Sequence, residues 1–351
     1  MDETIAATTS AEAAAVGDST RLVVPRWPLS SRLKYAVIAF LWKRLILKPL
    51  LYCSEFKKYF IPPGENEPDQ VKAYPVRKSL KIRIFFPPSY NPSTSSAETT
   101  TKLSTLLTCH GGGFMVIALD YSKGPRHRFP AAVHDVEALV GCVLADASLP
   151  VDAARAAVPV YPLLDRATAT AAKTRTRRYK PALGGFRARD SGFVAPMMGL
   201  FDWASLRPGQ RCDDPLVSPC YAPREHLPAG VFLIGCELDM LAHEAWRMAC
   251  RLAGRRVPSL DEAVGREEPG GKGELVTGGD ERFVWEETAE EDGLRVRWLL
   301  VPDTVHGFDQ SNIEGLVKDP VLMEDARIKT AKVIDLVGEW LLSGPLQATK
   351  S

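Results

Sequence analysis

The sequence lacks an excess of charge of either sign. Its 351 residues include 44 Lys and Arg against 43 Asp and Glu, which leaves a formal net charge of +1. Proteins built mainly to neutralise nucleic-acid phosphates usually carry a basic excess, so we expect no nucleic-acid partner. The seven cysteines are scattered and never occur in CxxC spacing. This argues against a disulfide framework and a cysteine-based zinc site, and it fits a reducing, intracellular compartment.

Motifs for nucleotides and metals are missing as well. The sequence contains no P-loop and no GxGxxG motif. His243-Glu244 begins an HExxH pattern, but the pattern fails because residue 247 is arginine. These motifs would hold phosphate groups and zinc, respectively. We therefore expect no cofactor and no metal site.

Long apolar runs are absent near the N-terminus. Within Arg32–Phe60, the longest uncharged apolar run is Tyr35–Trp42, which has eight residues, whereas a membrane-spanning helix needs about 20. The first residues are small and polar, without the basic start and apolar core of a secretory signal. We expect a disordered lead over residues 1–30 and a protein that is not secreted, either cytoplasmic or peripheral at a membrane.

Residues 31–65 nevertheless predict a helix of unusual composition, because basic and aromatic residues are mixed along it. Pro49 is expected to end this helix. The mixture suits a helix at a membrane interface, with peripheral membrane contact through residues 32–60. The alternative is an amphipathic cap helix whose apolar face covers a substrate pocket of the same protein. We prefer the cap, because soluble cap helices are common.

Strand and helix patterns alternate along the rest of the chain, residues 66–351. The predicted strands are 79–87, 103–109, 115–120, 156–161, 230–235 and 294–301, and the predicted helices are 130–147, 241–252 and 320–342. This alternation predicts an α/β fold, a mostly parallel sheet flanked by helices. The acidic segment 260–292 is interpreted as a flexible insertion, and the basic run Lys173–Lys180 as a solvated loop.

Three features with catalytic potential follow predicted strands, where open α/β sheets place their sites. The first is the loop HGGGF at 110–114, whose glycines allow a sharp turn and whose backbone N–H groups can hold a developing oxyanion. The second is Asp239, which can orient a histidine or simply cap the next helix. The third is His306, a general base or an ordinary surface histidine. Their order along the chain favours catalysis.

This order resembles the α/β-hydrolase superfamily, in particular the hormone-sensitive-lipase-like carboxylesterases of the fold-3 type. The similar pieces are HGGGF (110–114), LDYSKGPRHRFPAA (119–132), YPLLD (161–165), CELDML (236–241) and VHGF (305–308). The resemblance covers roughly residues 70–342 and implies a carboxylic ester hydrolase that acts on a small apolar ester. It implies an oxyanion hole formed by the N–H groups of Gly112 and Gly113, within the motif that begins with His110 and Gly111. It also implies Asp239 as the triad acid and His306 as the triad base.

The sequence departs from the family at the nucleophile, which is a serine in G-x-S-x-G on a strained turn between a strand and a helix. No such motif is present. VDAAR (151–155) looks like the lead into the family's nucleophile strand, and AAVPVYPLLD (156–165) looks like the strand after it. Only HGGGF separates two strands that should be parallel neighbours, whereas a parallel crossover needs a dozen or more residues. We therefore expect an incomplete fold, with one central strand and two helices missing.

Several alternatives stay open at this point. The chain is either a truncated product of splicing or gene modelling, or a pseudoenzyme that lost its nucleophile. We prefer truncation, because random loss should more often substitute the serine than remove a strand. In function, the chain is an inactive or impaired ester hydrolase by descent, a non-catalytic protein that binds a small ligand, or a chain that does not fold stably.

Overall fold

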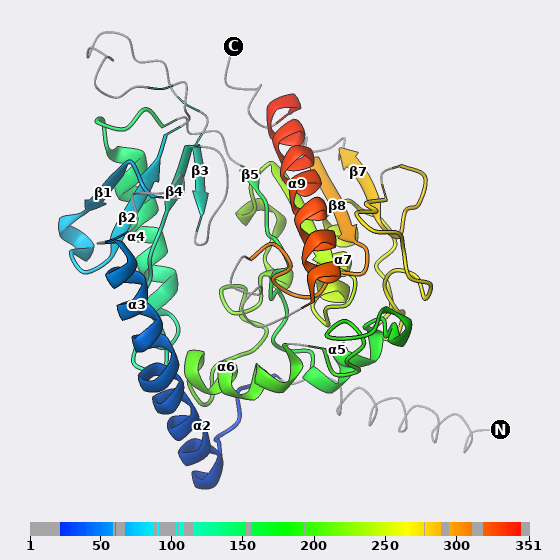
Figure 1. The fold of residues 1–351 in the computed structure, drawn as a ribbon, viewed down its shortest axis with the longest axis horizontal. Helices are drawn as coiled ribbons and strands as arrows, with labels where there is room; N and C mark the ends of the chain where they lie inside the picture. Colours follow the sequence, from blue (N-terminus) through cyan, green and yellow to red (C-terminus); the bar gives the residue numbers. More distant parts are fainter. Residues whose placement is uncertain are drawn as a thin grey trace. The chain divides into compact units, whose positions relative to one another are not determined.

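The structure is a computed structural model, drawn in Figure 1. It describes residues 22–58, 60, 67–86, 90, 103, 105–108, 115–151, 156–192, 194–276, 278–288, 295–310 and 319–344. The chain divides into two compact units. Unit 1 comprises Met1–Val24, Ala154–Gly199 and Gln210–Ser351, and unit 2 comprises Pro25–Ala153 and Leu200–Gly209.

Unit 2 contains a four-stranded sheet in the order β1-β2-β4-β3. Its strands are β1 (Gln70–Ala73), β2 (Lys81–Phe85), β3 (Thr105–Thr108) and β4 (Met115–Ala118). The β1–β2 and β2–β4 pairs are antiparallel, and the β3–β4 pair is parallel. Ile82 and Ile84 share one face of β2, since side chains alternate along a strand. They form a buried cluster with Leu139 and Val143, one turn apart on α4 (Ala131–Ala145).

Unit 1 contains a second four-stranded sheet, in the order β5-β6-β8-β7. Its strands are β5 (Ala156–Ala157), β6 (Gly230–Cys236), β7 (Val284–Thr288) and β8 (Arg295–Val301). The β5–β6 and β6–β8 pairs are parallel, and the β7–β8 pair is antiparallel. Every residue of β6 is buried. This explains its continuous apolar sequence, because a strand covered on both faces has no polar side.

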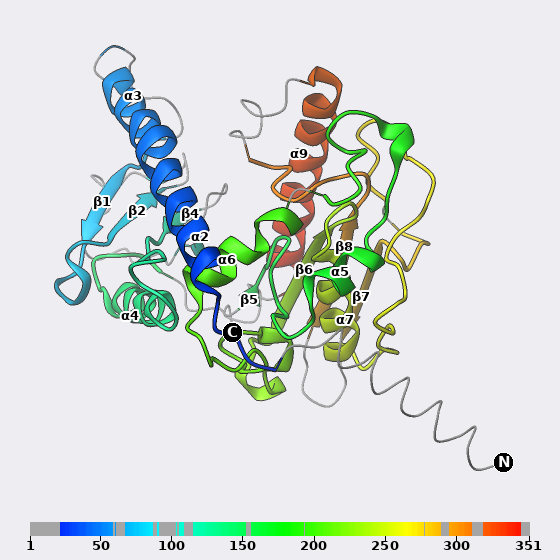
Figure 2. The ribbon, with the colours of Figure 1, turned by 90° about the horizontal axis from the view of Figure 1, so that it is seen from below.

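Two helices cover opposite faces of this second sheet, as Figure 2 shows. Val231 and Leu233 of β6 belong to a buried cluster with Ala245 of α7 (Ala242–Leu252). Phe232 points the other way and packs on Trp340 of α9 (Pro320–Ser343), with ring centroids 5.4 Å apart. The period of two along the strand thus divides its side chains between the two helices.

The other helices of the described residues lie at the start of unit 2 and between β5 and β6. They are α2 (Leu29–Leu41), a π-helical turn (Trp42–Leu47), α3 (Lys48–Lys58), α5 (Thr170–Thr176) and α6 (Met198–Ser205). Short 3-10 turns occupy Pro75–Arg77, Pro181–Leu183, Ala195–Met197, Pro219–Tyr221 and Arg224–His226. Across the described ranges, no helix combines the length and the apolar character needed to cross a bilayer.

The expected α/β fold is confirmed, since each predicted strand and helix has a counterpart among these elements. The expectation that Pro49 ends the N-terminal helix is wrong, because Pro49 is the second residue of α3. Pro49 lies inside a continuous helical segment, since α3 follows the π-helical turn directly and the Lys48 N–H donates to the Lys43 carbonyl. The preceding turn, Trp42–Leu47, is π-helical, a local widening that helices often show at irregular points.

The basic run Lys173–Lys180 is not the solvated loop that we expected. Lys173 and Lys180 are buried, and Lys180 Nζ lies 2.8 Å from Glu237 Oε2 and 2.7 Å from Asp303 Oδ1. The acidic segment closes the same cluster, because the Gly270 N–H donates to Asp303 Oδ2 at 2.6 Å. A buried charge is costly unless it is paired. Lys180 also donates to the Glu268 carbonyl at 3.1 Å, so the basic run and the acidic segment are in direct contact.

The acidic segment 260–292 also contributes to the sheet. It supplies strand β7 and the buried side chains Val264, Phe283 and Trp285. In the disordered lead that we expected over residues 1–30, residues 1–21 lie outside the described residues. Val24 is buried, and its N–H donates to the Gln210 carbonyl at 2.9 Å.

Candidate active site

Asp239 and His306 lie together in unit 1. Asp239 follows the end of β6 by three residues, and His306 follows the end of β8 by five. The two strands are parallel neighbours whose last residues, Cys236 and Val301, are paired, so both loops leave the sheet at one edge. His306 Nδ1 lies 2.7 Å from Asp239 Oδ2. The structure therefore brings the predicted acid and base into direct contact.

The burial of this pair differs between its members. The Asp239 side chain is 2% exposed, and the His306 side chain is 27% exposed. An ionised carboxylate only accepts hydrogen bonds, so Nδ1 of His306 carries the proton of this contact. The other ring nitrogen, Nε2, is then the one with a free lone pair. Chemically, the pair can accept a proton at Nε2 while Asp239 stabilises the imidazolium that forms.

The backbone around Asp239 fixes its carboxylate. Its Oδ1 accepts the N–H of Leu241 at 3.2 Å, and its own N–H donates to the Cys236 carbonyl at 2.9 Å. Helix α7 begins at Ala242 with Leu241 as its N-cap, so Asp239 precedes the cap position. Asp239 therefore orders the turn before the helix and orients His306 at the same time, and the two readings of this residue are compatible.

A buried guanidinium lies behind this turn. Arg177 donates to the Leu238 carbonyl at 2.6 Å and to the carbonyls of Arg189 and Asp190 at 2.7 and 2.8 Å. Burial lowers the pKa of Arg177, and the nearby Asp239 carboxylate opposes that shift. Arg177 therefore places a positive charge beside the candidate acid. Sequence reasoning missed it, because it lies in the run that we interpreted as solvated.

Tyr161 is a second residue that sequence reasoning missed. Its ring centroid lies 4.6 Å from that of His306, and its backbone has a φ of 39°, in the left-handed region. Its hydroxyl donates to Asp309 Oδ1 at 2.7 Å and accepts from Gln310 Nε2 at 3.1 Å. The signal in the sequence was its place at the end of a predicted strand, which puts it at the edge of the sheet where His306 lies.

These contacts make Tyr161 a support for the histidine loop and a poor nucleophile. Burial, with the neighbouring Asp309 carboxylate, raises the pKa of Tyr161 well above its usual value. The phenol therefore keeps its proton and acts as a hydrogen-bond donor. A positive φ is strained for a bulky residue, so the surrounding contacts hold the tyrosine against a local conformational preference.

The predicted oxyanion loop lies outside the described residues. These are His110, Gly111, Gly112 and Gly113. Their role therefore stays a prediction from the sequence.

No serine, threonine or cysteine in the described part of the chain hydrogen bonds to the Nε2 atom of His306. Cys236, at the end of β6, interacts electrostatically with Asp239, but it is fully buried. Burial raises the pKa of the Cys236 thiol well above its usual value. A thiol needs thiolate character and access to react, so Cys236 does not supply a nucleophile.

The chain leaves the sheet of unit 2 and enters the sheet of unit 1 at the place in the sequence where the nucleophile segment was expected. Leu103 forms an isolated parallel bridge with Val151, and its N–H donates to the Pro150 carbonyl at 2.6 Å. Strand β5 begins at Ala156 and pairs with β6 in the other sheet. Residues 152–155, between them, lie outside the described part. Val151, which bridges to Leu103 in unit 2, is thus separated by only four residues from β5, which belongs to the sheet of unit 1.

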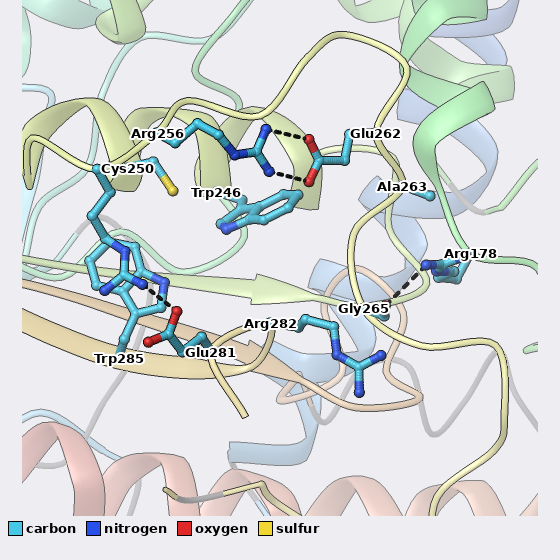
Figure 3. Close-up of a pocket in the computed structure, with 11 residues that line it drawn as sticks. Arg178, Trp246, Cys250, Arg256, Glu262, Ala263, Gly265, Glu281, Arg282 and Trp285 are labelled. Carbon is cyan, nitrogen blue, oxygen red and sulfur yellow. Dashed lines mark hydrogen bonds and ion pairs between the residues drawn. The ribbon is translucent and has the colours of Figure 1, made fainter. Parts of the chain in front are cut away.

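A pocket elsewhere in unit 1 does not contain this dyad. It has a volume of about 450 Å³ and lies among α7, the loop after it and the start of β7 (Figure 3). Four arginines line it, but their charges are largely matched: for example, Arg256 makes a two-pronged contact with Glu262 at 2.7 and 2.9 Å, and Arg255 pairs with Glu281 at 2.5 Å. These pairs leave little charge to recruit an ionic ligand.

Comparison with known proteins finds similarity at the level of structure. No family model and no curated protein sequence matches the chain. A structure from a study of two fungal esterases of Rhizomucor miehei is 18% identical, with 93% of this chain and 99% of that chain covered and a TM-score of 0.52. The chain therefore shares the fold of that esterase structure.

Two further solved structures are similar at lower scores. One is a hyperthermophilic esterase from the archaeon Pyrobaculum calidifontis, 18% identical, with 89% of this chain and 100% of that chain covered and a TM-score of 0.47. The other is an ester hydrolase from the metagenome of Lake Arreo, 17% identical, with 82% and 98% covered and a TM-score of 0.44.

Proposed function

We propose that this chain is a carboxylic ester hydrolase by descent, of the hormone-sensitive-lipase-like group, which keeps the acid and base of a catalytic triad and lacks the nucleophile. The observation that carries the proposal is the 2.7 Å contact between His306 Nδ1 and Asp239 Oδ2 at one edge of two parallel strands. The esterase-like fold supports it, and so does the HGGG sequence at 110–113.

The roles of the retained residues follow from their chemistry. In a complete enzyme of this kind, a serine hydroxyl attacks the ester carbonyl and gives its proton to His306 Nε2, while Asp239 holds the imidazole in place. The N–H groups of Gly112 and Gly113 would donate to the oxyanion. No serine in the described part of this chain contacts His306 to give up its proton. We therefore expect only the small residual rate that remains when a triad loses its nucleophile.

We attribute the loss of the nucleophile to removal of the whole segment that would carry it. The parallel bridge at Val151 and the start of β5 at Ala156 leave no room for a strand, an elbow and a helix between them. Likewise, β3 and β4 are parallel neighbours joined by only six residues, 109–114, fewer than the dozen of a usual crossover. Both junctions support a shortened product of a longer gene.

The transcript tests this account directly. Sequencing transcripts across codons 114–116 and 155–157 should find a longer form that encodes a G-x-S-x-G segment. Genomic DNA without such a segment near codon 155 would show instead that the nucleophile was lost in evolution.

Two assays on the purified chain test the lack of turnover. A fluorophosphonate probe, which labels activated serines, should not label the protein. Hydrolysis of p-nitrophenyl butyrate should proceed at the same residual rate in the wild type and in His306→Ala, because no serine depends on the histidine. Covalent labelling, or loss of activity in His306→Ala, would contradict the proposal.

The alternative is a binding protein for a small apolar ligand. It would melt cooperatively, and a non-hydrolysable ketone analogue of an apolar ester would raise its melting temperature. The probe would not label it, and it would not turn over the ester. Such a shift would favour binding over an impaired enzyme.

A further inference from the structure

The helical segment Leu29–Lys58, made of α2, the π-helical turn and α3, is poorly covered by the rest of unit 2. Helix α2 contains no buried residue. Large apolar side chains are exposed along the whole segment and just beyond it: Leu29, Leu33, Val37, Ile38, Phe40, Leu41, Trp42, Leu45, Ile46, Leu50, Tyr52, Phe56 and Phe60. Single exposed apolar residues are ordinary. A continuous series of this length marks an interaction surface.

Contacts within unit 2 account for only one narrow side of the helix. Tyr35 packs on Trp27 and Trp203, with ring centroids 5.6 and 6.0 Å apart. Ser31 and Ala39, one turn to either side of Tyr35, are half-buried, and the other residues of α2 are exposed. The packed side is therefore one residue wide per turn. The apolar side chains named above mostly lie away from it.

The charge of the segment points to the kind of surface that covers it. Leu29–Lys58 contains seven basic residues and one acidic residue, in a chain whose net charge is only +1. Arg32, Lys34, Lys43 and Arg44 are exposed among the apolar side chains. The Arg44 guanidinium lies over the Phe40 ring, 5.7 Å from its centroid. A partner must therefore offer negative charge and an apolar layer next to each other.

An anionic bilayer surface has these two layers. Lys and Arg can extend their charged ends to lipid phosphates while their stems and the neighbouring Leu, Ile and Phe enter the acyl boundary, and Trp and Tyr favour the headgroup level. At about 1.5 Å per residue, the segment would lie about 45 Å along the membrane plane. We propose that Leu29–Lys58 docks the protein on an anionic lipid surface as an interfacial helix.

Vesicle binding by the full chain tests this proposal. Sedimentation with vesicles of 70% phosphatidylcholine and 30% phosphatidylserine should carry the protein down, and pure phosphatidylcholine should carry at least tenfold less. Each basic residue near an anionic surface contributes about 1 kcal/mol, a factor of about five. The double variant Lys43→Glu/Arg44→Glu should therefore bind at least about 25-fold more weakly.

Matched controls separate the contribution of the helix to vesicle binding from the effects of net charge and of exposed apolar residues in general. Arg175→Glu/Lys272→Glu changes net charge equally at exposed positions of unit 1 and should bind like the wild type. Phe40→Ser/Leu45→Ser should lose binding, whereas Ile334→Ser/Leu342→Ser, exposed on α9, should keep it. Melting curves should show that all variants fold as the wild type does.

Three outcomes would overturn the proposal. The first is no preference for the anionic vesicles. The second is equal binding by the helix variants and their controls. The third is a stable dimer of the wild type, seen by light scattering and lost in Phe40→Ser/Leu45→Ser, because a second copy would then be the partner of this surface.

Discussion

Charged side chains are buried around the dyad, and the neighbours that neutralise them come from distant parts of the chain. Lys180 lies between Glu237 and Asp303, the residue after β6 and the second residue after β8. Burial alone would raise the pKa of Asp303, but the Lys180 ammonium and the Gly270 N–H more than offset it, and the pKa lies below its usual value. The cluster thus fixes the roots of both loops that carry Asp239 and His306.

Replacing Lys180 by methionine should leave two carboxylates buried without their cation. Breaking a buried ion pair from one side costs about 3–5 kcal/mol, so Lys180→Met should lower the free energy of unfolding in denaturant by about that amount. Lys272→Met, at an exposed position, should change it by less than about 0.5 kcal/mol. Equal effects of the two variants would show that the cluster contributes no stability.

His243 predicts a dependence of stability on pH. It is buried, and its Nε2–H donates to the Ser259 carbonyl at 2.9 Å. Burial, with a smaller contribution from Arg247, lowers the pKa of His243 to about 4, against about 6.5 in the unfolded chain. Between these values the unfolded chain binds the proton and the folded protein does not.

Acidification over this range should therefore destabilise the protein, because stability rises with pH wherever the unfolded state holds more protons. From pH 6.5 to pH 4, His243 should contribute a loss of up to about 3 kcal/mol. His243→Gln keeps a donor for Ser259 and should show a shallower decline in denaturant melts at matched pH. Parallel curves for the two proteins would assign the decline to other groups.

At the scale of elements, the close approach of β6 and β8 depends on a glycine. A Cβ built on Gly235 would lie 2.8 Å from a ring carbon of Trp298, which is fully buried. Gly235→Ala should therefore destabilise the protein by about 1–3 kcal/mol. Gly141 in α4 has no atom within 4 Å of an added Cβ, so Gly141→Ala should stabilise by about 0.5–1 kcal/mol. Thermal melts of both variants check the opposite signs.

How much of these elements the sequence could predict depends on their apolar pattern. Strand β6 is continuously apolar and α7 repeats its apolar residues at helical spacing, so both were predictable. Strand β1 has four residues, mostly exposed, and β7 reads VWEET within an acidic stretch. Such short polar strands form because a neighbouring strand pairs with them, and local sequence does not carry that information.

The same limit applies to the candidate site. Asp239 and His306 could be proposed from their order after predicted strands. The roles of Arg177 and Tyr161 depend on contacts made only after folding. The Arg177 guanidinium is buried against carbonyls of a distant loop, and the Tyr161 ring packs at a tilt beside a histidine 145 positions later. Burial of the basic run could not be predicted either, because its partner carboxylates come from three other segments.

At the scale of the whole molecule, each of the two sheets in the described part of the chain has a buried cluster of its own. One contains Ile82 and Ile84, and the other contains Leu233 and Trp298. A chain with two cores can unfold in two steps. We therefore expect two calorimetric transitions, with a total enthalpy larger than the van't Hoff value for a single step.

Core variants should move these transitions one at a time. Ile84→Ala and Leu233→Ala each remove a fully buried side chain and should cost about 2–5 kcal/mol. Each should shift only the transition of its own unit. One transition that both variants shift equally would show that the two cores unfold as a single cooperative body.

The junction between Val151 and Ala156 has a consequence for the history of this chain. A point mutation can change a side chain there, but a strand with its crossover helix requires about 30 residues. A serine placed by substitution in either flank would lack the turn that presents it to His306. A lineage that fixed this deletion in its genome could not regain the reaction by successive substitutions, so the retained acid and base would be free to diverge.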